Sequence, residues 1–233
     1  MKFVKLKYAF IFIGLLAGIV LCIFLLNKNR KYTISDYPSA NAMLLNAAAL
    51  GNLENAETAL AHGAEVNTTN EQHWTSLHMA TFHCHENMVR FLLSKGANVN
   101  AVNDSGMTPL EWAVGCDNDN EQMVKLLLDK GAEVNIEHES GHTPLLEAIS
   151  RGKEKVVKLL LDHGANVNAQ KKENGETALH LAVAYPYPKI VKLLLEHGAD
   201  ETIKDAKGKA PHISHVLEIL ESQGEKVNRP IND

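Results

Sequence analysis

The apolar positions of this chain fall into pairs of helical stripes, one narrow and one wide. In residues 177–198 the narrow stripe consists of Leu179, Ala182 and Val183, at the spacing of one helix face. A wider apolar stripe covers residues 190–195 and stops at Gly198, because glycine takes the left-handed conformation at a helix end without penalty. Thr177 precedes the first stripe and is expected to cap it. The pattern predicts two short helices followed by an extended turn.

The same unit recurs along the chain at a nearly fixed period. A Gly-Ala pair closes it at Gly63, Gly96, Gly131, Gly164 and Gly198, at intervals of 33, 35, 33 and 34 residues. Helices of about ten residues do not persist alone, so each unit must bury its apolar face against its neighbours. This period predicts a stack of repeats with a shared core rather than one globular core.

A second marker keeps the same register. Thr75-Ser76-Leu77-His78, Thr108-Pro109-Leu110-Glu111, Thr143-Pro144-Leu145-Leu146 and Thr177-Ala178-Leu179-His180 each lie 21 to 23 residues before a Gly-Ala pair. With this marker the chain resembles the ankyrin-repeat family over residues 38 to 228. The resemblance implies an all-α repeat solenoid of stacked helix-turn-helix units with β-hairpin-like loops, and a concave face that binds proteins.

The two ends of the repeat array depart from the pattern. Residues 41 to 67 have the Gly-Ala-Glu-Val-Asn ending but no Thr-Pro-Leu-His, so Ser39 or Asn41 is expected to cap the first helix. In the last unit Lys209-Ala210-Pro211-His212 replaces the motif, and the unit is about six residues short. We expect six units, at 38–70, 71–103, 104–138, 139–171, 172–204 and a truncated cap at 205–228, with a linker at 32–37 and a tail at 229–233.

The N-terminal segment 1–31 is expected to be a membrane anchor. Ala9 to Leu26 are 18 consecutive uncharged, mostly apolar residues, which span roughly 27 Å as a helix. The alternative is a cleaved signal peptide, but the nearest Ala-x-Ala is Ala40-Asn41-Ala42, well beyond the apolar core. Gly14 and Gly18 have a spacing that can pair membrane helices, although scattered glycines explain it better.

Orientation in the membrane is nearly balanced. Three lysines precede the apolar segment and three basic residues follow it, so the positive-inside rule decides little. A short N-terminal tail usually stays in the cytoplasm, which places the repeats on the non-cytoplasmic side, in the periplasm of a bacterium or in the lumen or exterior of a eukaryotic cell. Ankyrin domains in general are more often intracellular, which favours the other side.

Charge and composition argue against several functions. The net charge is −5, and no basic stripe exists outside the membrane flanks, so a nucleic-acid partner is disfavoured. No nucleophile motif or phosphate-binding glycine loop is present, and we expect no enzyme and no cofactor. His73, His78, His83, Cys84 and His85 crowd one window that could suggest zinc, but the repeat register accounts for most of them. We expect no metal site.

Cys84 and Cys116 fall near the inter-helix turns of adjacent repeats. Helices of neighbouring repeats pack about 8–10 Å apart, whereas a disulfide needs Cα atoms within about 7 Å. We therefore expect two free thiols.

Candidate partner contacts follow from the resemblance, which places the hairpin tips and the exposed part of each first helix on the concave face. Aromatic and arginine side chains are common at interface hot spots. In each repeat the mapped positions are the residue before the motif Thr and two residues late in the first helix. The candidates at these positions are Trp74, Phe82, His83, Met107, His142, Arg151, Glu176 and Tyr185.

Two structural readings compete with this hypothesis. Trp74 could cover a hairpin flank, and the Tyr185–Pro188 run could be only an inter-helix turn. Trp112 is expected to pack partly between repeats.

These expectations combine into one hypothesis, a membrane-anchored, non-enzymatic module that binds an unidentified protein. The alternative is a secreted effector released after N-terminal cleavage.

Overall fold

The computed structural model describes residues 33–116, 121–136, 141–185 and 187–228. The expected membrane segment Ala9–Leu26 lies outside these ranges. Within the ranges, none of the helices has the length and apolar character needed to cross a bilayer. The chain divides into two units, residues 1–36 and 37–233. In the first unit the described residues are Thr33 and the short 3₁₀ turn η1 (Ile34–Asp36).

The second unit consists of paired helices. First helices are α2 (Ala40–Leu50), α4 (Ser76–Phe82), α6 (Pro109–Gly115), α8 (Pro144–Ser150) and α10 (Ala178–Ala184). Second helices are α3 (Leu53–Ala61), α5 (Glu86–Ser94), α7 (Glu121–Asp129), α9 (Glu154–Asp162) and α11 (Pro188–Glu196). A single helix, α12 (Ser214–Ser222), follows the last pair.

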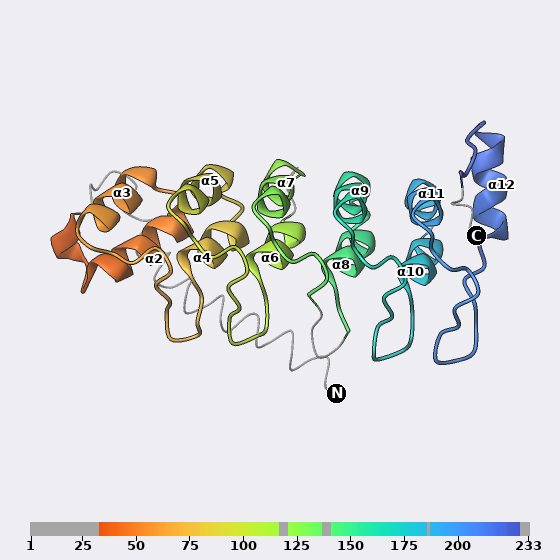
Figure 1. Cartoon of the computed structure of the whole chain (residues 1–233), viewed down its shortest axis with the longest axis horizontal. Coiled ribbons are helices and arrows are strands. Elements are labelled where there is room, and N and C mark those ends of the chain that lie inside the picture. Colours follow the sequence, from red (N-terminus) through yellow and green to blue (C-terminus); the bar gives the residue numbers. More distant parts are fainter. Residues whose placement is uncertain (1–32, 117–120, 137–140, 186, 229–233) are drawn as a thin grey trace. The chain divides into compact units, whose positions relative to one another are not determined.

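The pairs stack in two rows. First helices contact one another in chain order from α2 to α10, and second helices do so from α5 to α12. Figure 1 shows the hairpin loops projecting from the side of the first-helix row that is away from the second helices. We call the surface formed by the first helices and these hairpins the first-helix face.

The N-caps match the sequence pattern. Thr75 and Thr177 accept a hydrogen bond from the backbone N–H three residues later, at 3.2 and 3.4 Å. Thr143 does the same at 3.3 Å. At the first repeat the cap is Ser39, which accepts from the N–H of Ala42 at 3.1 Å, and these bonds confirm the predicted helix starts.

A ladder of asparagines joins one repeat to the next. Asn100 Oδ1 accepts from the N–H of Glu133 at 2.8 Å, and its Nδ2 donates to the carbonyl of Gly131 at 3.0 Å. Asn67, Asn135 and Asn168 make the equivalent pair of bonds. Each asparagine satisfies backbone groups of the loop that follows the next second helix. This contact explains why an asparagine recurs four residues after the glycine of the first four Gly-Ala pairs.

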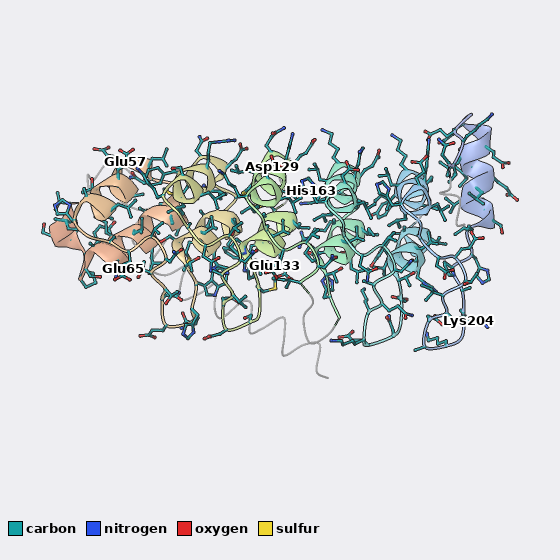
Figure 2. All side chains as sticks on the ribbon, in the orientation of Figure 1. Glu57, Glu65, Asp129, Glu133, His163 and Lys204 are labelled. Carbon is teal, nitrogen blue, oxygen red and sulfur yellow. A yellow bond between two sulfur atoms is a disulfide. The ribbon has the colours of Figure 1, made fainter. Side chains whose placement is uncertain are left out.

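Asn41 extends this ladder to the first unit instead of capping α2. Its Oδ1 accepts from the N–H of Glu65 at 2.9 Å. Ionisable side chains lie along the second-helix row, among them Glu57, Asp129 and His163, which Figure 2 labels. His163 Nε2 lies 3.6 Å from Asp129 Oδ1 in the neighbouring repeat, an exposed pair that contributes little to stability.

Candidate protein-docking site

The candidate site begins at the hairpin before α4. Asn70 Oδ1 accepts from the N–H groups of Gln72 and Trp74 at 3.0 and 2.9 Å, and the N–H of Asn70 donates to the carbonyl of Trp74 at 3.1 Å. His73 has a φ of 56°, so it fills a left-handed position where a hairpin glycine is usual. Its Nδ1 lies 2.5 Å from Asp104 Oδ1 of the next hairpin. These contacts fix the backbone of Trp74 on the first-helix face.

Three aromatic rings from two repeats meet above α4 and α6. The ring centroids of Trp74 and Trp112 are 4.9 Å apart, those of Phe82 and Trp112 are 5.0 Å apart, and those of Trp74 and Phe82 are 5.4 Å apart. The two pairs that involve Phe82 are edge-to-face, which is a favoured geometry for aromatic pairs. We call these three residues the aromatic triad.

The triad is only partly covered. Phe82 is 44% exposed, and both tryptophans have intermediate exposure. The Trp112 Nε1–H is buried and has no acceptor among the described residues. A large apolar cluster that remains partly in water on a preformed surface is a favourable anchor for a protein partner.

Two histidines border the triad. Burial lowers the pKa of His78, which accepts at Nδ1 from the backbone N–H of Thr75 and donates from Nε2 to the carbonyl of Met107, at 3.1 and 3.0 Å. Burial, followed by the proximity of His85, also lowers the pKa of His83, whose ring meets Phe82 edge-to-face at 5.0 Å. Both histidines are therefore neutral near pH 7.

The expectation that Cys84 and Cys116 are free thiols is wrong. The two residues form a disulfide, with Cα atoms 5.9 Å apart. The distance between helix axes does not limit this pair, because neither residue lies within a helix. Cys84 is in the left-handed turn after α4, with a φ of 59°, and Cys116 is the extended residue that ends α6, so the two chain segments converge.

The fourth repeat contributes a polar cluster to the same face. The Arg151 guanidinium donates from Nε to Glu147 Oε1, and Glu147 Oε2 lies 3.6 Å from His142 Nε2. Arg151 Nη2 also reaches the preceding repeat, lying 3.9 Å from the position that a Cβ on Gly115 would occupy. The predicted residues His142 and Arg151 are thus held by Glu147, which the sequence did not single out.

The remaining candidates are Tyr185 and Glu176 in the fifth repeat and Met107 in the third. Tyr185 is 48% exposed and stacks on Tyr187 with ring centroids 6.0 Å apart. Tyr187 also packs over Gly152, where an added Cβ would come within 2.9 Å of its ring, so this tyrosine has a structural role between repeats. Glu176 and Met107 have intermediate exposure, and the carbonyl of Met107 accepts the hydrogen bond from His78 in α4.

The predicted residues do not form one continuous cluster. The structure brings together Trp74, Phe82 and His83, whereas His142 and Arg151 belong to the polar cluster, and Tyr185 pairs with Tyr187. Trp112, expected only to pack between repeats, completes the triad. It lies four residues after the motif threonine, in register with the partly exposed Met79 and Glu147, and that register could have identified it.

The histidine-rich window does not form a metal centre in the part of the chain that is described. No three His, Cys, Asp or Glu side chains converge there as a metal ion would require, and Cys84 is bonded to sulfur.

Comparison with known proteins identifies the class. The family profile "Ankyrin repeats (3 copies)" matches residues 44–138 and 116–205, which together are more than half of the chain. The chain belongs to the ankyrin-repeat family.

Among curated relatives, protein phosphatase 1 regulatory subunit 27 of Homo sapiens is 34% identical over 85 residues, covering 36% of this chain and 55% of that protein. The RelA-associated inhibitor of Mus musculus is 36% identical over 74 residues, covering 32% of this chain and 9% of that protein. The chain thus spans about half the length of the first of these relatives and a small part of the second.

Proposed function

We propose that this protein is a non-enzymatic interaction module that docks a protein partner on its first-helix face, with the aromatic triad as the anchor. The observation that carries the proposal is the triad itself, in which Trp74, Phe82 and Trp112 pack within 5.4 Å of one another and Phe82 remains 44% exposed. Interface hot spots are enriched in tryptophan and tyrosine, and they sit in preformed, well-packed surroundings.

The surroundings of the triad extend this surface. The partly exposed His83 and the His142–Glu147–Arg151 cluster of the fourth repeat give this apolar centre a polar border, an arrangement typical of protein interfaces. The relatives agree with a binding role, since one is named a regulatory subunit and another an inhibitor. Both names describe proteins that act on another protein, and we extend only that general role to this chain.

The proposal includes display at a membrane through the apolar segment Ala9–Leu26, with the repeats on the non-cytoplasmic side. The Cys84–Cys116 disulfide supports this side, because disulfides form and persist mainly in oxidising compartments. Membrane attachment raises the effective concentration of a weak binder near partners in the same membrane. The second candidate function is a secreted effector, which the same disulfide also fits if the N-terminus is cleaved.

The docking proposal is tested by position-specific photo-crosslinking of the full chain in its native membrane. A photoreactive amino acid replaces Phe82 in one variant and Leu53 in the control; Leu53 is 37% exposed at the start of α3 in the second-helix row. We expect a protein adduct from position 82 and none from position 53. Equal labelling at both positions, or none at position 82, would contradict docking on the first-helix face.

The membrane proposal is tested separately with a C-terminal tag. Protease is added to intact cells, to cells with the outer barrier opened, and to full lysates. Digestion before full lysis, together with an uncleaved chain on the same gel, supports an anchored non-cytoplasmic domain. A shortened chain supports the secreted alternative, and protection until lysis contradicts the proposed side.

A further inference from the structure

Cys84 occupies a backbone position that is glycine in two other repeats. The turns between first and second helices contain Gly51 and Gly152, with φ values of 68° and 66°, and Cys84 has 59°. Residues with a Cβ avoid this left-handed region. A cysteine at this position therefore carries a backbone cost, and its side chain must be the reason for its presence.

The neighbouring turns show what fills the space beside this position. A Cβ on Gly51 would come within 2.9 Å of the His85 ring, and one on Gly152 would come within 2.9 Å of the Tyr187 ring. In both cases a side chain from the next repeat covers the turn and packs the two units together. At Cys84 the next repeat supplies Cys116, and the packing contact becomes a covalent bond.

The bond lies directly beside the aromatic triad. Phe82 is the last residue of α4, two positions before Cys84, and Trp112 is in α6, four positions before Cys116. The disulfide therefore joins the ends of the two helices whose rings form the Phe82–Trp112 contact. The Lys153 ammonium of the next repeat also holds this end of α6, donating to the carbonyls of Val114 and Cys116.

We propose that the Cys84–Cys116 disulfide is a redox-sensitive clasp that holds the aromatic triad in its docking geometry. The inference rests on the proposed function in taking the triad as the docking site. Cys116 is 4% exposed and Cys84 is more accessible, so a reducing thiolate attacks Cys84 Sγ. The Cys116 thiolate leaves and takes a proton, and a second thiol of the reductant resolves the mixed disulfide.

Two electrons and two protons thus pass from a dithiol, which becomes a disulfide, to the two cysteines. The unbonded sulfur atoms must then move apart, and the ends of α4 and α6 separate with them. The rings of Phe82 and Trp112 lose their fixed contact, while the remaining repeat interfaces keep the solenoid folded.

The chain provides its own probe for this change, because its two tryptophans, Trp74 and Trp112, are both in the triad. The experiment measures acrylamide quenching of tryptophan fluorescence in the full chain in detergent, oxidised and after reduction with dithiothreitol. We expect the quenching constant to rise roughly two-fold on reduction, as expected when side chains lose packing partners, with unchanged far-UV circular dichroism.

Cys84→Gly is the matched variant, since it removes the bond and restores the residue found at the equivalent turns. Its quenching should equal that of the reduced wild-type chain and should not respond to dithiothreitol. Equal quenching of oxidised and reduced wild type would overturn the clasp. Loss of helical signal on reduction would also overturn it, because the bond would then hold the whole solenoid.

The measurement uses no partner, so its failure leaves the docking proposal standing. Conversely, a crosslinked protein at position 53 but not at position 82 would contradict docking on the first-helix face, and the quenching result would not change that conclusion.

Discussion

Replacing Cys84 should destabilise the fold by an amount that depends on what replaces it. Both Cys84→Ser and Cys84→Gly remove the bond to Cys116. They differ in the backbone, because serine keeps a Cβ at a φ of 59° and glycine does not. The pair therefore separates the contribution of the cross-link from the cost of the left-handed turn.

The magnitudes follow from the loop and from the turn. The bond closes a sequence separation of 32 residues. Closing a loop of that length raises the free energy of the unfolded state by about 3.7 kcal/mol at 25 °C, because it lowers the entropy of the unfolded chain. A non-glycine residue in the left-handed region costs about 1–2 kcal/mol in the folded state. Glycine avoids this cost but loses more backbone entropy on folding, which offsets about 0.5–1 kcal/mol of its advantage. We expect losses of about 3.7 kcal/mol for Cys84→Ser and about 3 kcal/mol for Cys84→Gly.

The assay is urea unfolding of the full chain in mild detergent, followed by tryptophan fluorescence and far-UV circular dichroism. With a slope of about 2 kcal/mol/M, the midpoint should fall by about 1.5–2 M, and Cys84→Gly should unfold about 0.3 M above Cys84→Ser. Dithiothreitol should lower the midpoint of the wild type and leave both variants unchanged.

Either of two results would refute this reasoning. A wild-type midpoint that does not respond to reduction would show that the cross-link contributes nothing to stability. A Cys84→Gly variant less stable than Cys84→Ser would show that the turn does not favour glycine. Cysteine at this position would then carry no backbone cost for its disulfide to offset.

Three further predictions concern the scaffold. Asn100→Ala removes both bonds to the next repeat, including the acceptor for the Glu133 N–H, and should lower the urea-unfolding free energy by about 1–2 kcal/mol; an unchanged midpoint would contradict it. Gly141→Ala places a Cβ 2.5 Å from the backbone nitrogen of Lys172 at a φ of 77°, and should lower the thermal midpoint by several degrees, about 2 kcal/mol or more. Burial lowers the pKa of His78, so the contribution of its neutral form to stability is complete above about pH 6.5 and is lost as the pH drops from there to the lowered folded pKa. Between pH 7.5 and 5, the free energy of unfolding should therefore fall less in His78→Gln than in wild type.

Much of the fold could be predicted from the sequence because its determinants are local. The motif threonines, the apolar stripes and the Gly-Ala ends each act within one helix or one turn. The observed caps at Thr75, Thr143 and Thr177 confirm the predicted helix starts. Ser39 and Asn41 were equivalent candidates for the first cap. The choice between them depends on a contact 24 residues away, because Asn41 accepts from the N–H of Glu65 and leaves the cap to Ser39. Sequence spacing does not reveal that contact.

The site was harder to predict, because it forms between repeats. The separation of neighbouring helices predicts free thiols, but both cysteines lie beyond the helix ends, where their Cα atoms are 5.9 Å apart. A signal was present, since Cys84 aligns with Gly51 and Gly152 at the turn. Trp112 was assigned to packing because a single helix pattern cannot show that its ring meets Trp74 and Phe82 of the preceding repeat.

Docking on the aromatic triad is tested most directly by the affinity of the full chain for the protein that crosslinks to position 82. Wild type, Phe82→Ala and Leu53→Ala are compared under oxidising conditions, after circular dichroism confirms that all three are folded. Docking on the aromatic triad predicts at least roughly tenfold weaker binding for Phe82→Ala, the loss of about 1.4 kcal/mol or more expected at a hot spot, and no change for Leu53→Ala. Equal affinity for wild type and Phe82→Ala would contradict the claim that the aromatic triad anchors the partner.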